Sequence, residues 1–141
     1  MFFNQKELQS MEPHPKVLVV DDEELSQDFL RFFLSKKFEV YTTGSVNSFY
    51  SLIANVDFDV ILMDVFLRDS KDGLQLTKEI KKIEKYKDIP IFVMTAHNTT
   101  RDKNEALNAG AHLFLTKPLD GKYILNLIDE VLKKRSTSIP S

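Results

Sequence analysis

The sequence predicts an α/β fold in which a five-stranded parallel sheet carries helices on both faces. Short apolar runs alternate along the chain with segments of helical spacing, the pattern typical of parallel β-α-β units. Three of these runs are nearly unbroken stretches of Val, Ile, Leu, Met and Phe, as expected of strands covered on both faces. The 141 residues are 43% hydrophobic, enough for one domain with its own core. The predicted strands cover residues 17–20, 38–41, 60–63, 91–94 and 113–115.

Five segments carry apolar residues at the spacing of a helix with one buried face. The first has a stripe of Leu25, Phe29, Phe32 and Phe33, which we expect to face the core. Most of the eleven phenylalanines fall on such stripes or in strands, which indicates core packing rather than an aromatic binding surface. The other helices are marked by Val46, Phe49, Tyr50 and Ile53, by Leu76, Ile80 and Ile83, by Ala106 and Leu107 before Gly110, and by Ile124, Leu127, Ile128 and Val131.

Composition and charge exclude several classes of protein. The formal net charge of -2 argues against direct, sequence-independent binding to nucleic acid, which needs a broad basic surface. The absence of cysteine excludes thiol catalysis and Cys-ligated zinc. No apolar stretch approaches the roughly 20 residues of a membrane span, and the first residues lack the apolar core of a signal peptide. We therefore expect a cytoplasmic protein without membrane contact, with one domain at residues 15–134, an N-terminal extension at 1–14 and a C-terminal tail at 135–141.

Acidic residues follow two of the predicted strands. Asp21 and Asp22 come directly after KVLVV, and Asp64 ends VILMD. The carboxyl ends of parallel strands meet at one edge of a sheet, so these three carboxylates should converge. Adjacent carboxylates repel one another unless a cation lies between them, and Mg²⁺ is the natural hard cation for such a site. A third carboxylate there indicates either a metal ligand or a nucleophile.

A hydroxyl group and an ammonium group follow the last two predicted strands. Thr95 ends IFVMT and Lys117 follows LFLT, which would place both at the same edge. A hydroxyl donor and a compact positive charge are what phosphoryl oxygens require. Each residue alone has an ordinary explanation, because threonine is common in strands and lysine in solvated loops. Their joint placement favours a phosphate site.

Four motifs, KVLVVDDEE, VILMDV, VMTA and LTKP, resemble in order and spacing the receiver domain of bacterial two-component response regulators, over residues 15–134. The resemblance implies the flavodoxin-like strand order 2-1-3-4-5. It also implies that Asp64 accepts a phosphoryl group from a sensor histidine kinase or a histidine phosphotransfer protein. Such a protein is a signalling switch that modifies itself and is not an enzyme in the ordinary sense.

The resemblance also implies a role for each site residue. Mg²⁺ would be held by the carboxylates of Asp21, Asp22 and Asp64 and by the backbone carbonyl of Phe66. The bond between Lys117 and Pro118 would be cis. The phosphoryl oxygens would be bound by Thr95, Ala96 and Lys117.

Two residues are implied to transmit the signal. Thr95 would bind the phosphate and Phe114 would turn inward in response, although an ordinary edge-strand aromatic is the alternative for Phe114. The pair would couple phosphorylation to a downstream protein target that docks on the fourth helix, fifth strand and fifth helix.

The loop after Asp64 departs from the family pattern. It reads DVFLRDSKDG, with Leu67 where a methionine usually stands and with Gly73 one place later than is common. The family pattern therefore does not predict the shape of this loop. The side chains of Phe66 and His97 would flank the path of the hydrolytic water, and we expect bulky Phe66 to shield the acyl phosphate. His97 is expected to be a plain loop histidine.

Three alternatives come from other classes of protein. A phosphatase of the haloacid-dehalogenase type also uses an aspartyl nucleophile, Mg²⁺, threonine and lysine, but it needs two aspartates separated by one residue, which neither DDEE nor DVF provides. A nucleotide- or flavin-binding module would need a glycine-rich phosphate loop, and the four glycines are dispersed. A pseudo-receiver that binds partners without phosphorylation is the third alternative, which the complete acceptor set disfavours.

Overall fold

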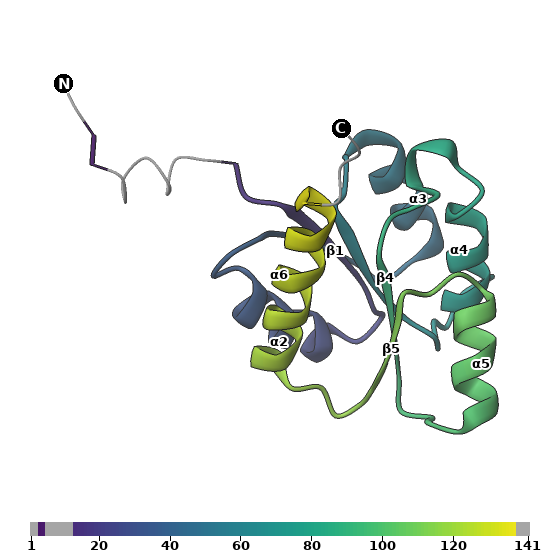
Figure 1. Ribbon diagram of the computed structural model, residues 1–141. Coiled ribbons are helices and arrows are strands. Elements are labelled where there is room, and N and C mark those ends of the chain that lie inside the picture. The colour runs from purple at the N-terminus through teal and green to yellow at the C-terminus, as the bar shows by residue number, and fades with distance from the viewer. Residues whose placement is uncertain (1–2, 5–12, 138–141) are drawn as a thin grey trace.

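The computed structural model describes residues 3–4 and 13–137, and it contains the predicted parallel sheet (Figure 1). All neighbouring strands pair in parallel in the order β2-β1-β3-β4-β5, which confirms the expected topology. The strands are β1 (Lys16–Val20), β2 (Glu39–Thr43), β3 (Val60–Asp64), β4 (Ile91–Thr95) and β5 (Leu113–Thr116). The helices are α2 (Glu24–Leu34), α3 (Val46–Asn55), α4 (Gly73–Ile80), α5 (Thr100–Asn108) and α6 (Gly121–Thr137), with a 3-10 turn at Glu84–Tyr86.

The sheet separates two hydrophobic layers, because successive side chains of a strand point to opposite faces. From β1, Leu18 and Val20 pack with residues of α3, α4 and α5. Val17 and Val19 pack on the other face with residues of α2 and α6. Figure 1 shows α2 and α6 on one side of the sheet and α3, α4 and α5 on the other. The central strands β1, β3 and β4 are buried along almost their whole length, as their apolar composition predicts.

The predicted buried stripe of α2 is wrong. Leu25 is 82% exposed, Phe32 68% and Phe29 38%, whereas Leu30 and Leu34 are fully buried. The helix carries apolar residues on two stripes, and only the stripe with Leu30 and Leu34 faces the sheet and α6. Periodicity identified the helix, but it could not choose between two stripes of similar character.

The expectation that most phenylalanines form the core is also wrong for the described residues. The buried ones lie on α3, in β4 and just before β2 and β3, while those on the outer stripe of α2 and in the loop after β3 reach solvent. Phe33 and Phe114 are half-buried. The buried phenylalanines are Phe38, Phe49, Phe58 and Phe92, and the exposed ones are Phe3, Phe29, Phe32 and Phe66.

Most element boundaries agree with the predictions. The second strand lies at the sheet edge as expected, but it covers Glu39–Thr43 rather than residues 38–41. The fourth helix ends before Gly110, whose φ of 109° is the positive value expected after a helix end. The third stripe ends early, because α4 stops at Ile80 and Ile83 is 38% exposed.

Residues 1–2 and 5–12 of the predicted extension and residues 138–141 of the predicted tail lie outside the described part of the chain. The division into extension, domain and tail stays a prediction. None of the helices within residues 13–137 combines the length and apolar composition that a membrane span needs.

The connection from β3 to α4 is held tightly behind Asp64. Asp72 begins α4 with a capping box, in which its side chain accepts from the Gln75 N–H and the Gln75 side chain accepts from the Asp72 N–H. The N–H of Gly73 donates to the carbonyl of Val65 at 2.9 Å. A Cβ atom at Gly73 would clash with the backbone oxygen of Asp64, so only glycine permits this close approach.

Candidate functional site

The structure brings the predicted site residues to one edge of the sheet. Asp21 and Asp22 follow β1, and Asp64 is the last residue of β3. Thr95 ends β4 directly after Met94, the Cα partner of Asp64. The N–H of Lys117, after β5, donates to the carbonyl of Thr95 at 2.8 Å, and the Lys117–Pro118 bond is cis as expected.

Three carboxylates and one ammonium group form the centre of this edge. Oxygen atoms of Asp21, Asp22 and Asp64 lie within 4.8 Å of one another. Asp21 is fully buried and Asp64 is 4% exposed. The Nζ atom of Lys117 lies 3.2 Å from Oδ2 of Asp21 and 3.5 Å from Oδ2 of Asp64. One ammonium thus serves two carboxylates, and the cluster of hard oxygen donors fits a Mg²⁺ ion.

The third carboxylate, Asp22, has its own cation. Oδ2 of Asp22 accepts from the backbone N–H of Arg68 at 3.0 Å and from Nε–H of Arg68 at 3.1 Å. Sequence reasoning missed Arg68, because its position depends on the path of a loop of uncommon length. The available signal was a cation four places after the third acid.

An aromatic pair joins the loops that follow β3 and β4. The rings of Phe66 and His97 lie 4.8 Å apart, centroid to centroid. The N–H of Phe66 donates to Oδ1 of Asp64 at 3.4 Å, and the N–H of His97 donates to Oγ1 of Thr95 at 3.1 Å. His97 therefore has a ring partner next to the site, which its loop position alone did not predict.

Thr95 and Phe114 line a common cavity of about 200 Å³. Thr95 is 1% exposed, whereas Phe114 on β5 is half-buried. Ala96, which follows Thr95, is exposed. The Phe114 ring therefore lies beside an open volume that reaches the threonine at the site.

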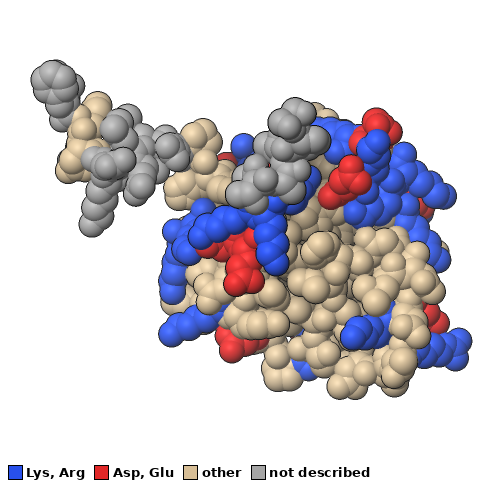
Figure 2. All heavy atoms as spheres, in the orientation of Figure 1, with Lys and Arg blue, Asp and Glu red and all other residues tan. Residues whose placement is uncertain are grey.

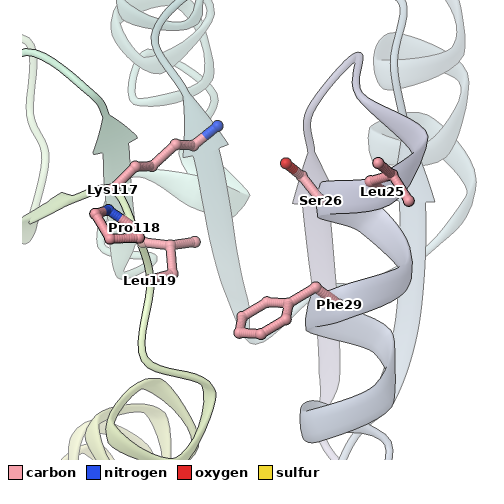
Figure 3. Close-up of a pocket in the computed structure, with 6 residues that line it drawn as sticks. All are labelled: Leu25, Ser26, Phe29, Lys117, Pro118 and Leu119. Atoms are coloured by element: carbon pink, nitrogen blue, oxygen red, sulfur yellow. The ribbon is translucent and has the colours of Figure 1, made fainter.

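A second pocket, of about 270 Å³, lies between α2 and the loop after β5 (Figure 3). Apolar side chains from both elements face this pocket, and Lys117 forms part of its wall. The pocket therefore connects the exposed stripe of α2 with the charged centre. Its lining residues are Leu25, Ser26, Phe29, Lys117, Pro118 and Leu119.

The electrostatics of the site differ from one carboxylate to the next. Burial, and next the negative charge of Asp21, raise the pKa of Asp64 from 3.8 to about 6, and Lys117 offsets this only in part. Burial also opposes ionisation of Asp22, but the hydrogen bonds from Arg68 hold the pKa of Asp22 below its usual value. Burial disfavours the charged form of Lys117, yet attraction to Asp64 and Asp21 raises its pKa.

Removal of the Asp64 charge is expected to stabilise the metal-free protein at neutral pH. An acid whose folded pKa is raised binds more protons when folded, so the free energy of unfolding falls as the pH rises from 3.8 through about 6. We expect Asp64→Asn to raise the free energy of unfolding by about 1–2 kcal/mol near pH 7 and to change it little near pH 4. Urea denaturation in EDTA at both pH values measures this.

Asp28→Asn, at an exposed position of α2, is the control and should have little effect at either pH. An Asp64→Asn variant that is no more stable than the wild type near pH 7 would contradict the expectation that the buried charge of Asp64 beside Asp21 destabilises the protein.

The chain is similar in sequence and fold to known receiver domains. Residues 17–129 match the response regulator receiver domain family. Chemotaxis response regulator CheY4 of Vibrio cholerae is 27% identical with a TM-score of 0.78, over 84% of this chain and 98% of that chain. The beryllofluoride-activated NtrC4 receiver domain dimer is 28% identical with a TM-score of 0.76, over 84% of this chain and 97% of that chain. A CheY-like receiver protein from Methanospirillum hungatei is 23% identical with a TM-score of 0.81, over 89% and 99%, and supports the fold alone.

The family match covers β1 from Val17 onward, the other four strands in full, and the four strand ends at which the carboxylates, Thr95 and Lys117 meet. The fold, the order of the motifs and the matched residues lead to one conclusion: the chain belongs to the response regulator receiver domain family.

Proposed function

We propose that this chain is a phosphorylation-dependent signalling switch in which Asp64 accepts a phosphoryl group. The observation that carries the proposal is the contact of Lys117 with both Asp21 and Asp64 in a buried cluster of acids. The phosphodonor is a sensor histidine kinase or a histidine phosphotransfer protein. In either donor, the phosphoryl group is carried on the imidazole of a phosphohistidine.

In the transfer step, a carboxylate oxygen of Asp64 forms a bond to phosphorus while the bond from phosphorus to the donor imidazole breaks in line. The imidazole keeps the electron pair of the broken bond and takes up a proton. The ammonium of Lys117 stabilises the charge on the phosphoryl oxygens. Asp21, Asp22, Asp64 and the carbonyl of Phe66 would hold Mg²⁺, which when bound neutralises further negative charge.

Reset is hydrolysis of the acyl phosphate. A water oxygen bonds to phosphorus, the bond from phosphorus to Asp64 breaks, and the free carboxylate returns with release of phosphate. The acceptor is the protein's own side chain, so the reaction is self-modification rather than turnover of a substrate.

The energies are sufficient for a switch. Phosphorylation adds about -1.5 to -2 charges, and a hydrogen bond to a charged group contributes roughly 1.5–3 kcal/mol. Inversion of a population from 1:99 to 99:1 needs about 5.5 kcal/mol. Two or three bonds from Thr95, Ala96 and Lys117, formed only in the phosphorylated state, would contribute about 3–9 kcal/mol, a range that includes this amount. The cavity shared by Thr95 and Phe114 gives the Phe114 ring room to move inward.

We propose two separate partner sites on the surface. The face of α5, β5 and α6, the fourth predicted helix, fifth strand and fifth helix, points toward the viewer in Figure 1. Figure 2 shows a largely uncharged area in the middle of this face, bordered by charged side chains. A downstream protein target is proposed to dock there. A phosphodonor has to reach Asp64, and the exposed apolar side chains Leu25 and Phe29 beside Lys117 offer it a contact surface. Direct contact with nucleic acid or membrane is not proposed, and the cytoplasmic location stays a prediction.

Phosphorylation of Asp64 is tested with acetyl phosphate and MgCl₂ followed by mass spectrometry of the intact chain. We expect the wild type and the Asp28→Asn control to gain the mass of one phosphoryl group. Asp64→Asn should gain none, because it lacks the nucleophilic oxygen. A wild type that gains no mass would favour a pseudo-receiver, and equal gain by Asp64→Asn would reject Asp64 as the acceptor.

The exposed ring of Phe66 is expected to slow hydrolysis by screening the acyl phosphate together with His97. Phe66→Asn should accelerate dephosphorylation about three- to tenfold, which corresponds to roughly 0.6–1.4 kcal/mol in the barrier. The decay of the phosphorylated chain after removal of acetyl phosphate gives the rate. Phe32→Asn, an exposed phenylalanine in the last turn of α2, is the control. An unchanged rate in Phe66→Asn would remove the shielding role.

Transmission through Thr95 is tested by NMR. In the wild type, phosphorylation should shift the amide signals of α5, β5 and α6. Thr95→Val keeps the side-chain volume but lacks the hydroxyl. The variant should still be phosphorylated, but the changes in amide chemical shift should be confined to residues near Asp64. Thr43→Val, a buried threonine at the end of β2, is the control and should behave as the wild type. Shifts of full extent in Thr95→Val would argue against the coupling.

A further inference from the structure

We infer that Arg68 acts as an internal cation that pairs with Asp22 in the metal-free protein and leaves when Mg²⁺ binds, so that it lowers the apparent affinity of the site for Mg²⁺. The inference rests on the proposed function, because it requires Asp22 to be a metal ligand. It assigns a role to a residue of the β3–α4 loop, where this chain departs from the common family pattern.

The contact geometry supports competition. Both donors of Arg68, the backbone N–H and Nε–H, reach the same oxygen of Asp22, at 3.0 and 3.1 Å. That carboxylate also belongs to the group whose oxygens gather within 4.8 Å. The Arg68 side chain is 82% exposed, whereas that of Asp22 is 16% exposed. The guanidinium is therefore mostly in solvent already, and its release from Asp22 would cost little packing.

The loop does not depend on this guanidinium. The backbone N–H of Arg68 makes its own bond to Asp22. The neighbouring carboxylate of Asp69 accepts from the N–H of Val46, at the start of α3, at 2.9 Å. Asp72 caps α4 at the other end of the loop. Loss of the Arg68 side chain should thus remove a charge while the loop keeps its anchors.

The charge balance gives the competition its direction. Within the described part of the chain, Lys117 pairs with Asp21 and Asp64, whereas Asp22 pairs with Arg68. Once a divalent ion joins Lys117, the three carboxylates are formally neutralised and the guanidinium has no charge left to compensate. Two cations near one carboxylate oxygen also repel one another. Binding of Mg²⁺ and pairing with Arg68 therefore oppose each other.

The first test measures the dissociation constant for MgCl₂ by isothermal titration calorimetry of the full chain. Arg68→Ala should bind Mg²⁺ about two- to fivefold more tightly, the effect expected when one exposed ion pair no longer competes. Lys87→Ala is the control, since it removes a positive charge from an exposed pair with Glu84 beside the 3-10 turn that precedes β4. Its affinity should equal that of the wild type.

The second test follows the Arg68 Nε–H signal of the wild type by NMR during titration with MgCl₂. Release from Asp22 should shift this signal in step with the amide signals of the site. If the wild type binds Mg²⁺ but Arg68→Ala binds it equally or less tightly, or if the Nε–H signal does not move, the competition is refuted while the proposed function stands. If no form binds Mg²⁺, both the competition and the proposed metal site fail.

Discussion

The crowding of Asp21, Asp22 and Asp64 at one edge of the sheet is the constraint on which the site depends. Parallel pairing brings the ends of β1 and β3 together, so the strand register forces the carboxylates into proximity. Two of them are almost completely buried and share one ammonium. Charge of this density is costly in a protein interior unless it is compensated. The arrangement favours any ligand that changes the local charge, which is what a switch requires.

The surrounding fold prevents the three carboxylates from moving apart to reduce their repulsion. The position of Asp64 is fixed, because Gly73 packs directly on its backbone oxygen. Val65, which follows Asp64, donates a backbone hydrogen bond to Met94 and accepts one from Gly73. Alternating apolar side chains of the central strands fill both layers beneath the site. The sheet therefore holds the acids together, whereas the loops beside it carry Arg68, for which we propose a change on ligand binding, and Phe66, for which we propose a role in hydrolysis. Rigidity at the strand ends and freedom in the loops are both needed for a response.

Much of this was predictable from the sequence, because it depends on short-range patterns. Buried strands read as apolar runs, and each site residue comes directly after one of them, so topology alone brought Asp64, Thr95 and Lys117 together. The buried face of α2 was not predictable, since its two apolar stripes differ only in how the helix is rotated on the sheet. The contact between Arg68 and Asp22 and the pairing of Phe66 with His97 depend on loop paths, which no periodic pattern encodes.

The two cations of the site differ in a way that follows from where they are attached. Lys117 follows β5, its side chain is 21% exposed, and its backbone N–H donates a hydrogen bond to the carbonyl of Thr95, so its attachment to the sheet is fixed beside Asp64. Arg68 extends from an exposed loop and can leave at little cost. A fixed cation is suited to bind the phosphoryl group, and an exchangeable one to compensate Asp22 until a metal ion arrives. On this proposal, the loop after β3 would change the affinity of the acidic cluster for a metal ion through Arg68, without any change in the three carboxylates themselves.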